Sequence, residues 1–223
     1  MTVKLFIQAI LKFTLGVVLV GILVFWPAGT FAYFNGWLFM GILFVPMFLA
    51  GLVMMAKNPA LLKSRLDAKE KQRDQDLVVK LSGLMFIVGF VIAGLNYRFG
   101  WHVLPQTVSI IATVVFLFAY LLYAEVLREN TYLSRTIQVQ DGQTVVDSGL
   151  YSIVRHPMYA VTLLLFLSMP LVLGSLLSFL VFLAYPFIIS KRIKGEEKLL
   201  EAELKGYRDY KAKVKYRLLP FIW

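Results

Sequence analysis

The sequence has 223 residues, of which 59% are hydrophobic and only 16% are charged, and its formal net charge is +10. A soluble domain of this length has more charged residues and shorter apolar runs, so this composition excludes a soluble fold. Cysteine is absent, which excludes disulfides, a thiol nucleophile and zinc–thiolate sites. Several apolar runs reach the ~20 residues that cross ~30 Å of hydrocarbon as a helix, and we therefore predict an all-α polytopic membrane bundle of about six transmembrane helices.

Four apolar runs predict an N-terminal four-span bundle within residues 1–127. The runs cover residues 5–26, 35–56, 81–97 and 102–127. The first run could instead be a signal peptide, but it is longer than an h-region. Aromatic residues near the predicted outer ends of these spans are expected to form an interfacial belt, namely Trp26, Tyr33, Trp37, Tyr97 and Trp101.

The fifth apolar run, residues 158–190, is too long for one crossing, since at ~1.5 Å per residue it would extend about 50 Å. Pro170, Gly174 and Ser175 mark a turn inside it, so we predict a hairpin of two helices over about 158–172 and 175–190. The positive-inside rule supports the hairpin, because it returns the ten Lys and Arg residues of the tail to the side that holds the other basic loops. The net charge therefore reflects topology and anionic lipid, and we predict no nucleic-acid partner.

The basic loop 57–80 opens with Asn58 as an expected N-cap and Pro59 at the first helical position. Leu61, Leu62, Leu66 and later Leu77 predict an amphipathic helix that lies on the membrane interface as a topological anchor.

Residues 128–223 form the second predicted domain and hold the candidate site. Asp141-Gly142 predicts a small hairpin or an extended loop ahead of the Arg155-His156-Pro157 turn. The tail is predicted to be helical from about Lys191, to break at Gly206 and to end at Pro220. Within it, Glu196 and Glu197 fall in the first turns, and Tyr207 and Tyr210 share one helical face.

A set of short motifs occurs in order over some 75 residues. The motifs are G-L-Y-S-I-V-R-H-P-M-Y at 149–159, Gly174-Ser175, then GEEKLL, GYRDY and YRLLP. Together they resemble the C-terminal signature of the isoprenylcysteine carboxyl methyltransferase family, which is related to membrane phospholipid methyltransferases. Two departures affect the backbone path: Leu150 stands where many members have proline, and Ala160-Val161 where a glycine is common.

The resemblance implies a membrane enzyme that uses S-adenosylmethionine and takes a lipid substrate from the bilayer. Carried over residue by residue, it implies a cofactor site formed by His156, Pro157, Tyr159, Glu196 and Glu197. The chemistry of the cofactor adds aromatic faces from Tyr151 and Tyr207, and Arg155 as a catalytic residue that pairs with a carboxylate. No metal site is predicted.

The acceptor decides whether a base is needed. A carboxylate is already anionic near neutral pH, whereas an amine must lose a proton. Glu125 is a candidate for that base, although it could equally pair with Arg128 one turn on. Because no other base is evident, we expect methylation of a prenylcysteine-type carboxylate, with phospholipid amine N-methylation as the alternative.

Each motif taken alone also has a structural explanation. The Arg155-His156-Pro157 turn could cap a helix, the acidic residues could form a solvated face, and the tyrosines could anchor at the interface. A non-catalytic membrane protein that kept the fold is therefore a second hypothesis, and an NADPH-dependent sterol-reductase-like protein is a third. We expect a multi-pass protein of the inner membrane in a prokaryote, or of the endoplasmic reticulum in a eukaryote, with its site facing the cytoplasm.

Overall fold

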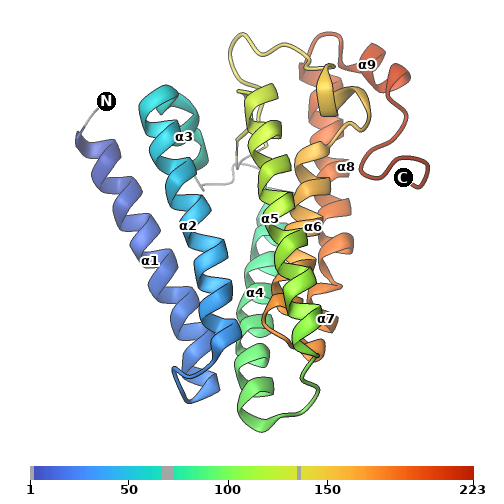
Figure 1. Ribbon diagram of the computed structural model, residues 1–223. Coiled ribbons are helices and arrows are strands. Elements are labelled where there is room, and N and C mark those ends of the chain that lie inside the picture. Colours follow the sequence, from blue (N-terminus) through green and yellow to red (C-terminus); the bar gives the residue numbers. More distant parts are fainter. Residues whose placement is uncertain (1–2, 67–72, 135–136) are drawn as a thin grey trace.

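The computed structural model describes residues 3–66, 73–134 and 137–223, and its long helices form one bundle (Figure 1). The four predicted N-terminal spans are confirmed as long apolar helices. They are α1 (Val3–Ala28), α2 (Phe34–Lys57), α4 (Arg73–Phe99) and α5 (Gln106–Glu129). The protein is therefore an all-α, multi-pass membrane bundle, as its composition predicts.

The predicted hairpin over 158–190 is also confirmed. Its first arm is α6 (Pro157–Val172), and its second arm is α7 (Leu176–Phe182) followed by α8 (Tyr185–Glu203). Gly174 makes the turn with a φ of +72°, a conformation that glycine adopts without steric cost. The second arm is interrupted between α7 and α8 because Pro186 has no N–H and its ring clashes with a carbonyl one turn back.

The tail helix does not begin at Lys191 as predicted. α8 runs without a break from the hairpin into the tail, so Glu196 and Glu197 lie in its second half rather than in its first turns. The break at Gly206 is confirmed, with a φ of +86°, and α9 (Tyr207–Lys213) follows it. The membrane arm and the acidic pair therefore belong to one rigid element.

The two ends of the bundle differ in charge. The N-terminus, α3, the loop after α5 and α9 lie at one end, where the basic segments gather, and the α1–α2 and α4–α5 connections lie at the other (Figure 1). Trp26, Trp37 and Trp101 are exposed near this second end, as expected of an interfacial belt. Tyr33 is not part of that belt: it is buried, and its hydroxyl donates to the Leu173 carbonyl.

The helix predicted after Asn58 forms as α3 (Pro59–Leu66), and the Asn58 Oδ1 accepts the Leu61 N–H at 3.0 Å. Its apolar face differs from the prediction, because Leu61 and Leu62 are buried against the bundle instead of facing lipid. Leu77 belongs to α4 and is exposed. The rest of the predicted loop, residues 67–72, lies outside the described residues, as do residues 135–136.

No β-strand forms in the described part of loop 130–148, so the alternative of a small hairpin is not adopted there. The chain instead makes an extended loop with a turn at Asp141-Gly142, where the Gln143 N–H donates to the Gln140 carbonyl at 3.0 Å.

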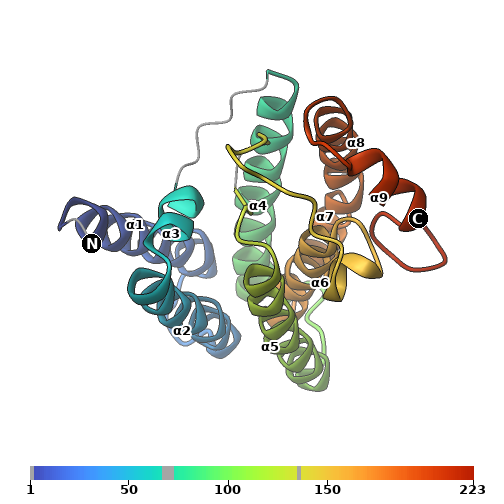
Figure 2. The same ribbon diagram turned by 90° about the horizontal axis from the view of Figure 1, so that it is seen from above.

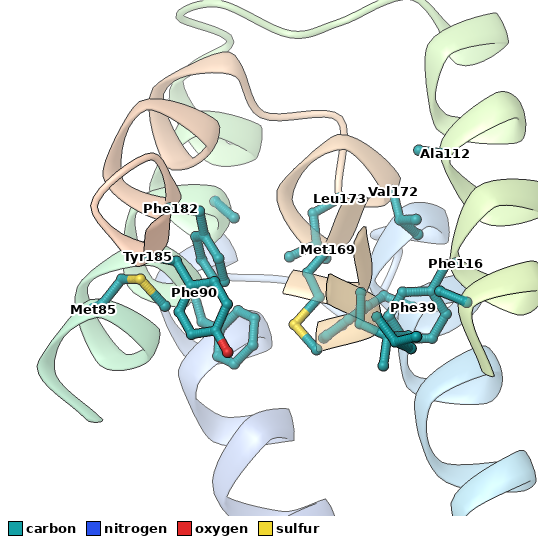
Figure 3. Close-up of a cluster of buried hydrophobic side chains, with 14 of the residues drawn as sticks. Phe39, Met85, Phe90, Ala112, Phe116, Met169, Val172, Leu173, Phe182 and Tyr185 are labelled. Carbon is teal, nitrogen blue, oxygen red and sulfur yellow. The ribbon is translucent and has the colours of Figure 1, made fainter. Parts of the chain in front are cut away.

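A layer of buried aromatic rings joins α2, α4, α5 and α7 (Figure 3). The Phe182 ring lies 5.9 Å from the Phe90 ring, which in turn lies 5.4 Å from Phe39. Glycines allow this close packing, since a Cβ at Gly89 would lie 2.3 Å from the Phe182 ring. Seen from above, α6, α7 and α8 lie on one side of α4 and α5, and α1 to α3 on the other (Figure 2).

Replacing Gly94 by alanine should lower the thermal unfolding midpoint of the protein in detergent. The new methyl would lie 2.5 Å from the Val24 carbonyl oxygen, and a helix backbone cannot move aside as a side chain can. Overpacking of this kind costs about 1–3 kcal/mol, against a gain of ~1 kcal/mol in helix propensity over glycine.

The matched control is Gly83→Ala on the same helix, where a Cβ meets nothing within 4 Å. Its midpoint should equal or exceed that of the unchanged protein. Equal midpoints for the two variants would contradict the close α1–α4 contact.

Candidate functional site

The Arg155-His156 turn is held by the C-terminal strap, which we define as residues 214–219. The Arg155 N–H donates to the Tyr216 carbonyl and the His156 N–H to the Arg217 carbonyl, both at 2.9 Å. Pro157 follows as the first residue of α6, a position where a missing N–H costs nothing. The backbone of the Arg155-His156 turn is thus hydrogen-bonded to a second segment of the chain.

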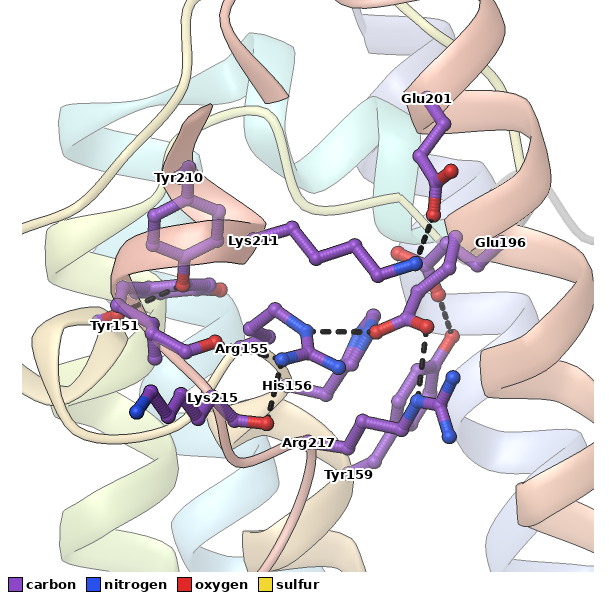
Figure 4. A network of polar contacts seen from close by, with 12 residues as sticks. Tyr151, Arg155, His156, Tyr159, Glu196, Glu201, Tyr210, Lys211, Lys215 and Arg217 are labelled. Atoms are coloured by element: carbon purple, nitrogen blue, oxygen red, sulfur yellow. Dashed lines mark hydrogen bonds and ion pairs between the residues drawn. The ribbon is translucent and has the colours of Figure 1, made fainter. Parts of the chain in front are cut away.

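The Glu197 carboxylate, almost fully buried on α8, is the centre of the site. Arg155 Nε donates to its Oε1 at 2.8 Å, and Arg217 Nε donates to its Oε2 at 2.9 Å. The His156 Nε2 lies 3.4 Å from the same Oε1. A buried carboxylate is stable when charged donors surround it, and here two arginines, Arg155 and Arg217, come to it from two different segments (Figure 4).

Arg155 is occupied by the protein itself. Besides Glu197, its Nη1 donates to the Val214 and Lys215 carbonyls at 2.6 and 2.7 Å. The side chain is buried. Arg155 therefore joins the turn, α8 and the strap.

Glu196 faces a different partner from its neighbour. The Tyr159 hydroxyl donates to Glu196 Oε2 at 2.5 Å, and Arg192 Nε donates to the Tyr159 oxygen at 3.1 Å. The His156 ring stacks near Tyr159, with 5.7 Å between the ring centroids. The two glutamates therefore have different surroundings. Glu197 pairs with two arginines of the fold, whereas Glu196 lies in the wall of a cavity.

A cavity of about 90 Å³, the site cavity, lies between the loop 130–146, the Arg155-His156 turn, α8 and α9. Six of the predicted site residues line it, namely Tyr151, Arg155, His156, Tyr159, Glu196 and Tyr207. The structure thus brings the Arg155-His156 turn and Tyr159 into contact with the acidic pair, and their predicted role in cofactor binding stays a prediction. Pro157 and Glu197 lie directly behind this wall.

The Tyr207 hydroxyl is a buried polar atom without a hydrogen-bond partner among the described residues. Burial raises the pKa of this hydroxyl, and the nearby carboxylates of Glu197 and Glu196 raise it further. The group therefore stays protonated at physiological pH and can donate. Since buried polar atoms are nearly always paired, this hydroxyl is available to donate to a water or to a bound ligand.

The other tyrosines of the site are structural partners. The Tyr210 hydroxyl donates to the Tyr151 carbonyl at 2.7 Å, and Asn130 Nδ2 donates to the Tyr151 hydroxyl at 3.0 Å. Burial raises the pKa of both Tyr151 and Tyr210 as well. Tyr207 and Tyr210 are both buried on α9, which confirms that they share one face.

Gly149 and Leu150 explain the start of the motif. Gly149 has a φ of +51°, and a Cβ there would lie 1.4 Å from Glu129 Oε1. The two Glu129 oxygens accept the Leu150 N–H at 3.1 and 3.0 Å. The departure at Leu150 thus has a use, because a proline at this position would have no N–H to donate.

Glu125 does not join the site. It lies on α5, forms no part of the cavity wall, and accepts two bonds from Arg128 at 2.8 and 2.5 Å. Glu125 therefore forms the ion pair with Arg128 that the sequence offered as its structural alternative. The catalytic roles predicted for Glu125 and Arg155 stay predictions.

Arg192, Arg217 and Asn130 belong to the site but are not among the residues predicted from the sequence. Arg217 lies within the YRLLP motif, so its position in the motif could have drawn attention to it. Arg192 precedes the acidic pair by one helical turn, which places it on the same face as Glu196. Asn130 ends α5 and has no sequence signal of its own.

Comparison with known proteins gives one family match. Residues 108–202 match the model of the isoprenylcysteine carboxyl methyltransferase family, which confirms the resemblance. The match covers α5, the loop, the hairpin and most of α8, and it ends before α9 and the strap. No curated protein matches the chain.

Replacing Glu197 by glutamine should destabilise the protein strongly, because it leaves Arg155 buried without its anion. Breaking a buried ion pair costs about 3–5 kcal/mol. We expect a lower unfolding midpoint and faster tryptic cleavage after Lys213 and Lys215, as the strap detaches from the turn.

Glu125→Gln is the control, since it removes the same charge from an ion pair on the exposed face of α5. Its unfolding midpoint and cleavage pattern should stay unchanged. If Glu197→Gln behaves in the same way, Glu197 is not the centre of the site.

Proposed function

We propose that this protein, a membrane methyltransferase by its region of the isoprenylcysteine carboxyl methyltransferase family, transfers the methyl group of S-adenosylmethionine to the carboxylate of a lipidic acceptor. A prenylcysteine-type carboxylate is the acceptor we favour. The observation that carries the proposal is the site cavity, whose wall includes Glu196 and Tyr207, the latter with a hydroxyl that has no hydrogen-bond partner among the described residues.

The residues of the site cavity fit this cofactor. A carboxylate suits ribose hydroxyls or an ammonium group, and Glu196 offers one beside Tyr159. The Tyr207 hydroxyl, which has no partner among the described residues, can donate to a polar group, and the rings of Tyr151, Tyr159 and Tyr207 offer faces for a cation or an adenine. When bound, S-adenosylmethionine would supply an electrophilic methyl that an anionic acceptor takes without any proton transfer.

The task of this chain is therefore positioning and exclusion of water rather than acid–base chemistry. Glu197 fixes Arg155 and His156, and through them the start of α6. Tyr159, on the first turn of α6, then positions Glu196 through its hydrogen bond to that carboxylate. In this proposal Arg155 acts by holding the turn and the strap, and Glu125 takes no part because Arg128 neutralises it.

The amine alternative needs a base at the reacting atom. Of the described carboxylates in the cavity wall, Glu196 already accepts from Tyr159 at 2.5 Å. This supports a carboxylate acceptor over an amine. By the positive-inside rule, the end that carries the site faces the cytoplasm.

The decisive experiment incubates purified protein in nanodiscs with methyl-labelled S-adenosylmethionine and either a farnesylated N-acetylcysteine or a phosphatidylethanolamine. We expect label in the farnesylated acid, released as methanol by alkali because it is a methyl ester. Label that resists alkali in the phospholipid would support amine methylation instead. No label in either lipid, with folded protein, would reject the proposal.

Replacing Tyr207 by phenylalanine should weaken binding of S-adenosylmethionine about threefold to tenfold, the value of one hydrogen bond. The unfolding midpoint without ligand should stay the same or rise, because the hydroxyl has no partner to lose within the part of the chain that the structure describes. Isothermal titration and thermal unfolding measure the two effects.

Tyr210→Phe is the matched control, three residues away on the same face. Its hydroxyl donates to the Tyr151 carbonyl, so its loss should lower the unfolding midpoint of the ligand-free protein. If Tyr207→Phe destabilises the ligand-free protein and leaves the affinity unchanged, the Tyr207 hydroxyl is not a ligand contact.

A further inference from the structure

A second cavity, the apolar chamber, lies on the other side of α5 and α6 from the site. It has a volume of about 540 Å³, is partly open, and is lined by residues of α1, α2, α3, α5 and α6. Its wall is mainly aliphatic and aromatic, for example Phe13, Met47, Met55, Phe116, Leu127 and Leu165. In Figure 2 the α1–α3 group lies on the opposite side of α4 and α5 from α8.

Polar atoms of the wall are satisfied within the protein along most of the chamber. The Tyr120 hydroxyl donates to the Leu43 carbonyl at 2.8 Å, and the Thr162 hydroxyl pairs with the Tyr185 hydroxyl at 2.8 Å. An occupant of this part must therefore be an apolar chain, since a polar one would lose its hydrogen bonds to water.

One end of the chamber carries positive charge instead. Arg65 of α3 and Lys12 of α1 both line it. The Arg65 guanidinium donates to the Tyr123 hydroxyl and lies over its ring, and Lys12 Nζ donates to the Leu66 carbonyl at 2.5 Å. Among the described residues neither cation has a carboxylate partner, and each keeps further N–H donors.

This end meets the candidate site through Met158. Arg65 Nη1 lies 3.9 Å from the Met158 sulfur, and Met158 also lines the site cavity. An anion bound by Arg65 would therefore lie beside the wall that separates the two cavities. A guanidinium suits a carboxylate, whose two oxygens match its fork.

We infer that the apolar chamber binds a single-chain lipid that ends in a carboxylate, with Arg65 as the residue that holds the carboxylate next to the site cavity. The orientation of the carboxylate toward methyl transfer rests on the proposed function, whereas the binding of the lipid in the chamber does not. Arg65 and α3 lie outside the region that matches the family, so acceptor recognition is assigned to the N-terminal half of the chain.

The test compares binding of a farnesylated N-acetylcysteine with binding of its methyl ester, by displacement of a fluorescent fatty-acid analogue. The unchanged protein should prefer the acid. Arg65→Gln should weaken binding of the acid about tenfold to hundredfold and leave the ester unaffected, as expected for loss of a charge-assisted pair. Arg65→Lys keeps the positive charge but lacks the planar guanidinium, so it should weaken binding of the acid less than Arg65→Gln does.

Lys63→Gln is the matched control on the same helix, because Lys63 is exposed and does not line the chamber. It should bind the acid like the unchanged protein. Equal weakening by both variants, or no change with Arg65→Gln, would overturn the inference.

A second pair of variants tests the place of the apolar chain. Gly51 lines the chamber and a Cβ there meets nothing within 4 Å, so Gly51→Leu should fill the space and weaken both acid and ester. Gly83→Leu, equally open but away from both cavities, should change neither. Normal binding by Gly51→Leu would contradict occupation of the chamber.

These measurements separate the two proposals. Acid-selective binding that depends on Arg65, in a protein that transfers no methyl group, supports the lipid site and rejects the proposed function. If the protein transfers methyl to the farnesylated acid and Arg65→Gln does not change that transfer, the result supports the proposed function and rejects the lipid site.

Discussion

The burial of one carboxylate organises this protein's polar end. Glu197 would be too costly to bury alone, so the fold must bring cations to it from elsewhere in the chain. Arg155 comes from the turn before α6 and Arg217 from the strap. Because Arg155 also binds two strap carbonyls, the same requirement fixes the backbone on both sides of the site cavity.

The division of labour within the acidic pair follows from its place on α8. Adjacent helical residues point about 100° apart, so one of two neighbours can face the core while the other faces a cavity. Glu197 takes the first role and Glu196 the second, with Tyr159 as its donor. The two cavities then lie on opposite sides of the α6 start, where Met158 touches both Arg65 and the site cavity.

The sequence predicts the spans and the hairpin, because apolar length, glycine and proline act locally. The meeting of residues 155–159 with the acidic pair is expected only from the resemblance to the family, since no local signal joins segments some forty residues apart. The sequence misplaces the start of α8, since the composition changes at Lys191 while the helix does not. It gives Arg217 no role, because the pairing of the strap with the turn spans some sixty residues and leaves no periodic signal. The chamber was likewise beyond prediction, as it depends on how α3 folds back over α1 and α5.

The pairing between the strap and the turn also has a meaning for biosynthesis. A ribosome delivers Arg155 well before Arg217, so a chain made only as far as residue 213 offers Glu197 one arginine and not two. The wall of the site cavity closes when residues 214–219 settle against the start of α6. A nascent chain that stalls before residue 214 would carry α1 to α8 and still lack its closed polar end.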